Sequence, residues 1–327
     1  MKKRQTLIIT GIVLIAAILL SFLLGRYKVS LSDLAGILTG RIKDTPEATA
    51  VLRIRLPRIL MSVLVGACLS AAGAAYQGVF QNPMAAPDIL GASAGAGFGA
   101  ALAIFLNAGS AGITAMAFVM SLVTVVLVMY IGKYAKGERV LGIVLAGIMI
   151  SSLAQAGTSF IKLVADPSNK LPAITYWLMG SLVGATNKEL KFVIFPMLAG
   201  LIPLIILRWR INILTLGDEE AESIGVNAKR VRTAVIICAT LVTASAVSVS
   251  GMIGWVGLVI PHMMRRIVGS DYRYLMPASM LGGGLFLLLV DNFSRNVSST
   301  EIPIGILTAF VGAPFFLALI TRRGEYK

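Results

Sequence analysis

The residues able to carry protons are few, and the sequence places them at the ends of its apolar segments. Four of them flank such segments: Asp88, Lys162, Asp291 and Glu301. No Asp, Glu, Lys or Arg lies in the middle of one, whereas a proton or sodium relay needs ionisable groups inside the membrane. The only histidine, His262, comes late in an apolar segment, where a structural or interfacial role is favoured over proton transfer. The pattern argues against ion-coupled transport.

One Gly–Lys pair, Gly132-Lys133, could belong to a nucleotide-binding P-loop. Such a loop needs a glycine near its start and a serine or threonine after the lysine, to hold the phosphates and magnesium. Leu127 and Tyr134 stand at these two positions. We therefore expect no catalytic residue, no metal site and no bound cofactor in this chain. Either another subunit supplies the energy for transport, or the protein is a channel.

The 327-residue chain has the composition of a membrane protein. Hydrophobic residues make up 57% of it and charged residues 13%, with a mean hydropathy of +0.86. A soluble domain would have about 25% charged residues, so a cytosolic enzyme is excluded. The formal charge of +14 could suit a nucleic-acid binder, but the basic residues are scattered in loops, as at membrane surfaces. Cys68 and Cys238 lie in apolar runs, and we expect no disulfide.

The first apolar run could be mistaken for a signal peptide, because it follows Lys2-Lys3-Arg4. It is about 18 residues long, beyond the usual apolar region of about 7 to 15, and no small-x-small cleavage site follows. We interpret it as a transmembrane helix. The chain is expected to be an all-α polytopic protein with one transmembrane domain over 1–327 and about ten spans. These lie near 6–25, 59–80, 89–107, 112–132, 140–162, 191–208, 233–250, 252–266, 275–291 and 302–320.

The distribution of basic residues predicts that both termini lie in the cytoplasm. An even number of spans puts the termini on one side, and Lys and Arg favour the cytoplasmic side. With the termini inside, 17 of the 29 basic residues are cytoplasmic and 12 are outside. Seven of the outside residues fall in one segment, Arg26 to Arg58. A separate role for that segment would explain why the margin is modest.

The longest cytoplasmic loop, residues 214–230, has the pattern of a short surface helix. Asp218 and the acidic residues after it suit a helix N-terminus, and Gly225 suits the position after a C-terminus. A solvated, charge-rich loop is the alternative, and the residues alone do not separate the two.

Taken together, five motifs make the chain resemble a known family. Five motifs carry the resemblance: Arg55-Leu56-Pro57-Arg58; Gln77 with 81–87 (Gln-Asn-Pro-Met-Ala-Ala-Pro) and Leu90-Gly91; the 220–226 loop (Glu-Ala-Glu-Ser-Ile-Gly-Val); 254–262 (Gly-Trp-Val-Gly-Leu-Val-Ile-Pro-His); and 301–309 (Glu-Ile-Pro-Ile-Gly-Ile-Leu-Thr-Ala). Together they are similar to the permeases of type II ABC importers for iron-siderophores, haem and cobalamin, the FecCD-like permeases. The resemblance covers essentially the whole chain.

The resemblance implies ten helices and a set of partners. A second permease subunit, identical or a paralogue, would complete the pathway. Two cytoplasmic ATPases would bind ATP and Mg²⁺, and an extracytoplasmic substrate-binding protein would dock outside. The loop would insert into the ATPase through Leu216, Gly217, Glu220, Ala221, Gly225, Val226, Lys229 and Arg230. Glutamates of the binding protein would be received by Arg55, Arg58 and Arg295, because charge complementarity orients and speeds docking.

The resemblance also implies pathway residues. Asn82 and Pro83 would lie at the cytoplasmic gate, although a simple turn-capping Asn is the alternative. Ser151, Ser152 and Gln155, on or near one face of the fifth span, would line the pathway. Residues 166–182 would form a surface or re-entrant helix near the outer channel mouth, with interfacial anchoring by Tyr176 and Trp177 as the alternative.

The implied function is that of a permease subunit in the bacterial cytoplasmic membrane, passing a metal chelate inward. Iron-siderophore is the first expectation for the substrate, with haem and cobalamin as alternatives. Two other classes stay open. A secondary transporter would need the charge relay that the sequence lacks. A channel or structural scaffold would leave the 214–230 loop without a function.

Overall fold

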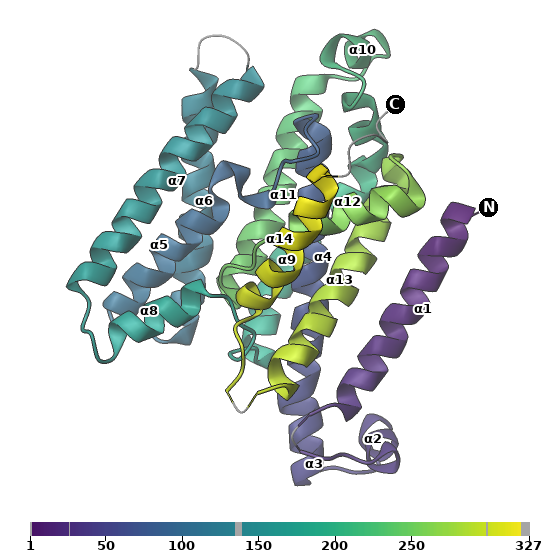
Figure 1. Ribbon diagram of the computed structural model, residues 1–327, viewed down its shortest axis with the longest axis vertical. Coiled ribbons are helices and arrows are strands. Elements are labelled where there is room, and N and C mark those ends of the chain that lie inside the picture. Colours follow the sequence, from purple (N-terminus) through teal and green to yellow (C-terminus); the bar gives the residue numbers. More distant parts are fainter. Residues whose placement is uncertain (1, 26, 135–138, 299, 322–327) are drawn as a thin grey trace.

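A computed structural model describes residues 2–25, 27–134, 139–298 and 300–321, and within these ranges the protein is built of helices without strands (Figure 1). The helices, in chain order, are α1 (Lys2–Leu23), α2 (Leu31–Leu38), α3 (Pro46–Thr49), the π-helical turn η1 (Ala50–Arg55), α4 (Leu56–Val79), the 3₁₀ turn η2 (Pro87–Leu90), α5 (Ala92–Phe105), α6 (Ser110–Lys133), α7 (Arg139–Val164), α8 (Lys170–Leu178), α9 (Asn187–Leu214), α10 (Asp218–Ser223), α11 (Ala228–Ser250), α12 (Val256–Val268), α13 (Tyr272–Asn296) and α14 (Ile304–Thr321). The expected all-α class is confirmed.

Each of the ten expected spans overlaps one of these helices, but not all are long enough to cross a membrane alone. Seven helical segments have the length and composition of a span: 3–23, 46–79, 110–133, 140–164, 187–214, 228–250 and 272–296. α5 and the 304–318 part of α14 are shorter apolar helices, and α12 has 13 residues. The sequence pattern overestimated α5 because Pro87 to Leu90 form a separate turn that ends at Gly91, in the left-handed region at φ 73°.

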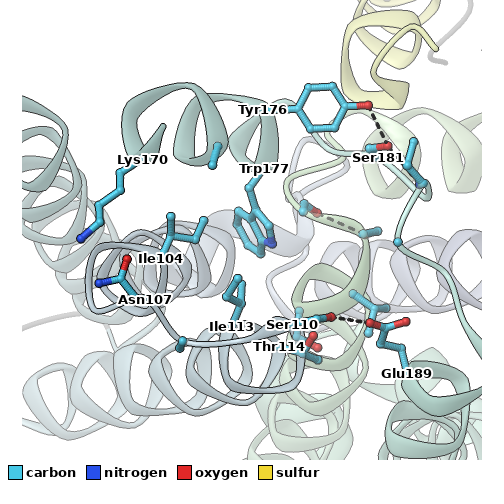
Figure 2. Close-up of a pocket in the computed structure, with 18 of the residues that line it drawn as sticks. Ile104, Asn107, Ser110, Ile113, Thr114, Lys170, Tyr176, Trp177, Ser181 and Glu189 are labelled. Atoms are coloured by element: carbon cyan, nitrogen blue, oxygen red, sulfur yellow. Dashed lines mark hydrogen bonds between the residues drawn. The ribbon is translucent and has the colours of Figure 1, made fainter. Parts of the chain in front are cut away.

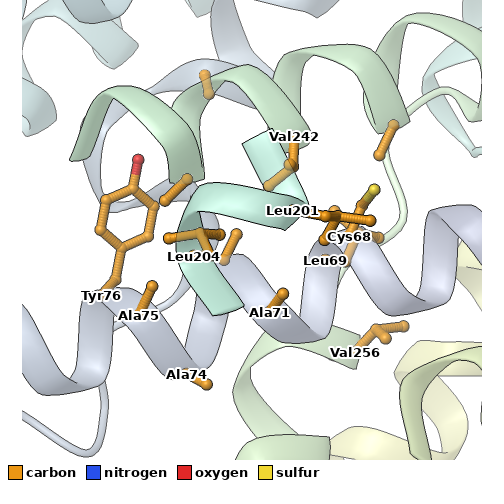
Figure 3. Close-up of a cluster of buried hydrophobic side chains, with 14 of the residues drawn as sticks. Cys68, Leu69, Ala71, Ala74, Ala75, Tyr76, Leu201, Leu204, Val242 and Val256 are labelled. Carbon is orange, nitrogen blue, oxygen red and sulfur yellow. The ribbon is translucent and has the colours of Figure 1, made fainter. Parts of the chain in front are cut away.

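The core is organised around α4. In its most apolar stretch 83% of the residues are buried, and it packs against α9, α11, α12 and α13. Figure 3 shows side chains of α4, from Cys68 to Tyr76, facing Leu201 and Leu204 of α9 and Val242 of α11. The Tyr76 hydroxyl shares a hydrogen bond of 3.0 Å with Thr240 of α11. α4 is therefore the element against which α9, α11, α12 and α13 are positioned, while α5, α6 and α7 pack on one another.

Glycine contacts let the helix backbones around α4 approach closely. A Cβ added at Gly73 would overlap the carbonyl of Gly257 in α12, and one added at Gly66 would overlap that of Gly283 in α13. Close approach at small residues is the usual basis of helix association in lipid, where apolar surface alone gives no preference for a neighbouring helix. Both cysteines are free, as expected, with Cys68 buried in this region.

The outer helices contrast with this core. Only 22% of the apolar stretch of α1 and 17% of that of α7 is buried. Large apolar side chains such as Ile9, Met149 and Phe160 face outward on them. The N-terminal end of α1, the C-terminal end of α14 and α10 all lie toward one end of the molecule, and α2 and α3 lie at the other (Figure 1). We call the first the α10 end and the second the α2–α3 end.

Candidate functional site

The expected helix in the 214–230 loop is present as α10. It starts at Asp218, directly after Gly217, and ends at Ser223, with Ile224 as the C-cap residue. Gly225 follows with φ 85°, a conformation that favours glycine. The backbone amide of Gly225 donates to the carbonyl of Glu222 at 2.9 Å, and that of Val226 donates to the carbonyl of Ala221 at 2.9 Å. This is the Schellman arrangement, so the turn closes by satisfying the last carbonyls of the helix.

The expected coupling residues divide into an outward and an inward set. Outward are Leu216, Glu220, Gly225, Lys229 and Arg230; Gly217 and Val226 are half-buried, and Ala221 is fully buried. Ala221 therefore faces the permease itself, where its small size lets α10 lie against the helix bundle. The outward surface is instead apolar at both edges of α10, because the side chains of Leu216 and Ile224 are 62% and 57% exposed.

A buried arginine ties α10 to the bundle. Arg232 of α11 donates from Nη1 to Asp218 Oδ2 at 2.9 Å and from Nη2 to Asp218 Oδ1 at 2.6 Å, and its Nε contacts the carbonyl of Val79 at 3.5 Å. Such a two-pronged pair fixes both partners in orientation. Sequence reasoning counted Arg232 only as a cytoplasmic charge. The ion pair could have been expected from the sequence, because Asp218 lies at the start of the loop helix and Arg232 lies about one turn into the next helix.

The turn after α4 lies close to the same structure. Gln81 has a φ of 49°. Its side-chain amide donates to the carbonyl of Leu214 at 2.7 Å, which connects this turn to the end of α9. Asn82 and Pro83 are exposed. The Asn82 side chain accepts the amide of Met84 at 2.9 Å, so Asn82 also has the local turn-capping geometry. The gate role of Asn82 and Pro83 stays a prediction.

The expected pathway residues on α7 are not equivalent. Ser152 and Gln155 are exposed, and Ser159 extends the same face, because residues three and four apart lie on one side of a helix. Ser151 is half-buried and lies against Gly91, where an added Cβ would overlap its Oγ. Ser151 therefore belongs to the contact between α7 and η2, and the exposed polar face consists of Ser152, Gln155 and Ser159.

The three expected docking arginines lie inside the protein at the α2–α3 end. Arg55, Arg58 and Arg295 are 5%, 8% and 8% exposed. Arg55 donates to the carbonyls of Phe22 and Tyr27, and Arg295 donates to the carbonyl of Ser21 at 3.2 Å. The unpaired carbonyls at the C-terminus of α1 attract cations, so these two arginines anchor the end of α1 to η1 and α13.

Arg58 is held by two carboxylates. Its guanidinium donates to Asp291 of α13 and to both oxygens of Glu301, which lies between α13 and α14. The exposed cations between α1 and α4 are others: Lys28, Arg41, Lys43 and Arg53. Asp291 and Glu301, which the sequence showed only as acids at span ends, are thus ion-pair partners of an arginine that the motif singled out.

The segment 166–182 contains the expected surface helix as α8, which borders a cavity of about 620 Å³ (Figure 2). Trp177 points into this cavity, while Tyr176 is 41% exposed and contacts Ser181 at 3.4 Å. Lys170 Nζ donates to the carbonyl of Phe105 at 2.7 Å and lies 5.2 Å from the centre of its ring. Across the cavity, Ser110 donates to Glu189 at 2.5 Å. α8 is therefore held to the C-terminal end of α5 by the contact of Lys170 with Phe105, and interfacial anchoring by Tyr176 and Trp177 stays a prediction.

A further ion pair lies at the α10 end, between α12 and α13. Asp271 accepts hydrogen bonds from Arg273 Nε at 2.9 Å and from the Asn212 amide at 2.7 Å. The hydrogen bonds from Arg273, and to a smaller extent that from Asn212, lower the pKa of Asp271 to about 2. Asn212 also accepts the amide of Tyr272 at 2.8 Å, so this pair connects the end of α9 to the start of α13.

Comparison with known proteins identifies the family. The model of the FecCD transport family matches residues 13–322. The chain is 37% identical over 315 residues to the molybdate import system permease protein MolB of Haemophilus influenzae, with 95% of this chain and 94% of that protein covered. It is 36% identical over 331 residues to the Fe(3+)-citrate import system permease protein YfmE of Bacillus subtilis, with 98% and 96% covered.

A solved structure agrees with the sequence relatives. It is described as an inward-facing conformation of a metal-chelate type ABC transporter, and it matches with a TM-score of 0.88 and 36% identity over 97% of this chain and 99% of that one. The resemblance indicated by the five motifs is confirmed. The chain belongs to the FecCD transport family and is the multi-pass membrane permease of an ABC importer.

Proposed function

We propose that this permease, paired with a second permease subunit, forms the pathway by which a metal chelate enters the cytoplasm. The observation that carries the proposal is the different construction of the two ends. One presents α10, whose exposed apolar residues and acidic rim lie beside Lys229 and Arg230, and the other presents the exposed cations Lys28, Arg41, Lys43 and Arg53. Two surfaces of different chemistry at opposite ends suit two different partners, one on each side of the membrane.

The α10 end would contact the ATPase. Leu216 and Ile224 would enter an apolar cleft, while Glu219, Glu220 and Glu222 would meet polar groups at its rim, as apolar centres and polar rims do in protein interfaces. ATP and Mg²⁺ would be bound and used by that subunit. The α10 end would then be cytoplasmic, which also places both termini in the cytoplasm.

The α2–α3 end would receive the substrate-binding protein. The exposed cations Lys28, Arg41, Lys43 and Arg53 would attract an acidic face at long range. Arg55 and Arg295 are occupied by carbonyls of α1, so a direct role in docking falls first on Arg58. Reversing the charge of Arg58 is a poor docking test, because it would place a third carboxylate beside Asp291 and Glu301.

Docking is better tested with the exposed cations. The triple substitution Arg41→Glu, Lys43→Glu and Arg53→Glu should weaken binding of the solute-binding protein encoded with this permease and reduce uptake, while membrane insertion is unchanged. Lys188→Glu with Lys191→Glu, on exposed residues at the start of α9, is the control. If the control loses as much affinity as the triple variant, docking depends on overall charge and not on this segment.

The substrate remains a proposal, because the relatives named above carry different solutes. The polar face of α7 consists of hydroxyl and amide groups without a charge, which suits passage of a bulky polar chelate without tight binding. Iron-siderophore is our first candidate, and haem, cobalamin and molybdate are the alternatives.

Reconstitution into liposomes with the ATPase and the binding protein should show ATP-dependent uptake of one of these four solutes. Uptake of iron-siderophore would support the first candidate, and uptake of another solute would replace it. Uptake that continues without ATP but collapses with the ion gradient would contradict the whole proposal.

A further inference from the structure

At the outer end of α4 one arginine binds two carboxylates of different accessibility. Arg58 Nε donates to Asp291 Oδ1 at 2.9 Å, while Nη1 and Nη2 donate to Glu301 Oε1 and Oε2 at 3.0 and 2.7 Å. The Asp291 side chain is 0% exposed, and that of Glu301 is 27% exposed. Asp291 is therefore fixed inside the protein, while Glu301 covers the outward edge of the guanidinium.

The surrounding cluster is incompletely neutralised. We call Arg55, Arg58, Arg295, Asp291 and Glu301 the arginine cluster; its three cations face two carboxylates. Asp291 Oδ2 and Arg295 Nε are buried without a hydrogen-bond partner and meet only across an ion-pair distance of 3.7 Å. Buried networks that are partly satisfied are costly to keep in one arrangement. The cluster is thus suited to accept a different carboxylate.

The residues that follow Glu301 are hydrogen-bonded to the end of α13 and to the residue pair after α8. Ser294 Oγ donates to the carbonyl of Ile302 at 2.6 Å, and the amide of Ile302 contacts the Ser294 carbonyl at 3.4 Å. The amide of Ile304 donates to the carbonyl of Gly180, just after α8, at 2.8 Å. A displacement of Glu301 would therefore act on the start of α14 and on the end of α8.

We propose that Glu301 holds the place of a carboxylate from the docking partner. On docking, an Asp or Glu side chain of the substrate-binding protein replaces Glu301 on Nη1 and Nη2 of Arg58, while Asp291 stays on Nε. The exchange leaves the charge of the cluster unchanged, so no buried charge is left unpaired, and Glu301 moves into water. This inference rests on the proposed docking of that partner at the α2–α3 end.

Two isosteric variants separate exchange from simple electrostatics. Glu301→Gln and Asp291→Asn each remove one negative charge beside Arg58, so their long-range effects on an acidic partner are the same. Exchange predicts that Glu301→Gln binds the solute-binding protein about fivefold more tightly, because a partly exposed ion pair no longer competes. Asp291→Asn should not bind more tightly, because Glu301 still covers Arg58.

The measurement is the dissociation constant of that binding protein for the permease–ATPase complex in nanodiscs, at fixed salt and for variants that elute as single species. Equal tightening by both variants would show a long-range charge effect and overturn the exchange. Weaker binding by Glu301→Gln would also overturn it, because the native carboxylate would then assist docking.

Hydrogen–deuterium exchange of the unaltered complex gives a second test. Docking should increase exchange at the amides of Ile302 and Ile304, whose bonds depend on the position of Glu301. Unchanged or slower exchange there, with docking observed, would refute the exchange while the docking proposal stands. Failure of the binding protein to bind the unaltered complex at all would instead refute the docking proposal, and this inference with it.

Discussion

The two ends of the permease each fix a functional segment with an arginine, but they do so in opposite ways. At the α10 end, Arg232 is 8% exposed and its partner Asp218 is 48% exposed, in a single two-pronged pair. At the α2–α3 end, Arg58 is shared between a fully buried Asp291 and a surface Glu301. The first arrangement has one state that satisfies both partners. The second has a partner that can leave while the arginine remains paired.

This difference suits the two partners of the proposed function. If α10 transmits force from an ATPase, it benefits from a rigid attachment, and Arg232 supplies one between α10, α11 and the end of α4. If the α2–α3 end binds and releases a substrate-binding protein, it benefits from an attachment that can be exchanged. The following predictions break one arrangement at a time.

The largest expected effect is on stability, at the α2–α3 end. Arg58→Met leaves Asp291 buried without its main cation, a loss of about 3–5 kcal/mol. Arg232→Met leaves a half-exposed Asp218 that water can solvate, so the loss is about 1 kcal/mol or less. Heating detergent-solubilised variants and measuring the fraction that stays monodisperse should rank Arg58→Met far below Arg232→Met. Equal melting temperatures would contradict the contrast between the two pairs.

The second prediction concerns coupling at the α10 end. Arg232→Met should lower uptake per ATP hydrolysed to half or less, because α10 is no longer held in orientation. Its stability should stay close to that of the unaltered protein. Arg210→Met, on an exposed residue of α9 outside the 214–230 loop, is the matched control for loss of a charge. If both variants transport equally well, the attachment of α10 through Arg232 is not needed for coupling.

Much of the fold follows from the sequence because the helices are apolar blocks bounded by polar residues. For the 214–230 loop, the run of acids and Gly225 suit a short helix, but the residues alone did not separate a helix from a solvated loop, and the structure has the helix α10. The expected spans 89–107 and 252–266 are longer than the helices α5 and α12, because backbone turns interrupt the apolar run before each helix. η2 interrupts it before α5, and Gly251 with Trp255, at φ 65° and 70°, does so before α12. Such turns depend on packing around them, which hydropathy does not report.

The arginines show where local reasoning ends. Arg58 was singled out by its motif, but its partner Asp291 is 233 positions away, so its burial could not be seen locally. The topology contained a usable signal: Arg58 starts one expected span, Asp291 ends another and Glu301 precedes a third, all on the same side of the membrane. An ion pair among them was therefore predictable. Which carboxylate is buried and which is exposed required the packed helices.

The third prediction sharpens the description of the α10 surface. Gly225 lies at φ 85° with open space where a side chain would project. Gly225→Ala and Gly225→Trp have the same backbone strain of about 1–2 kcal/mol, and only Trp adds bulk toward the partner. Gly225→Asn, which tolerates this conformation, controls for strain. Trp alone should abolish co-purification of the ATPase. Equal loss with Ala would mean that the shape of the turn, and not contact, is what matters.

The smallest effect is expected for the ion pair Asp271–Arg273. It serves as the reference for the ion pairs of Arg58 and Arg232, because its arginine is largely exposed. Because the pKa of Asp271 is lowered to about 2 in the folded protein, against about 3.9 in unfolded chains, the pair stabilises the fold above about pH 4. That contribution is lost as the pH falls toward 2. The side chain of Arg273 is 60% exposed, so solvent screening limits the contribution of the pair to about 1 kcal/mol.

The unaltered protein should have a slightly higher melting temperature than Asp271→Asn at pH 6, and this difference should disappear as the pH falls from 4 to 2. A gap that persists at pH 2 would show that Asp271 acts through the neutral hydrogen bond with Asn212, which would make the link between α9 and α13 independent of charge.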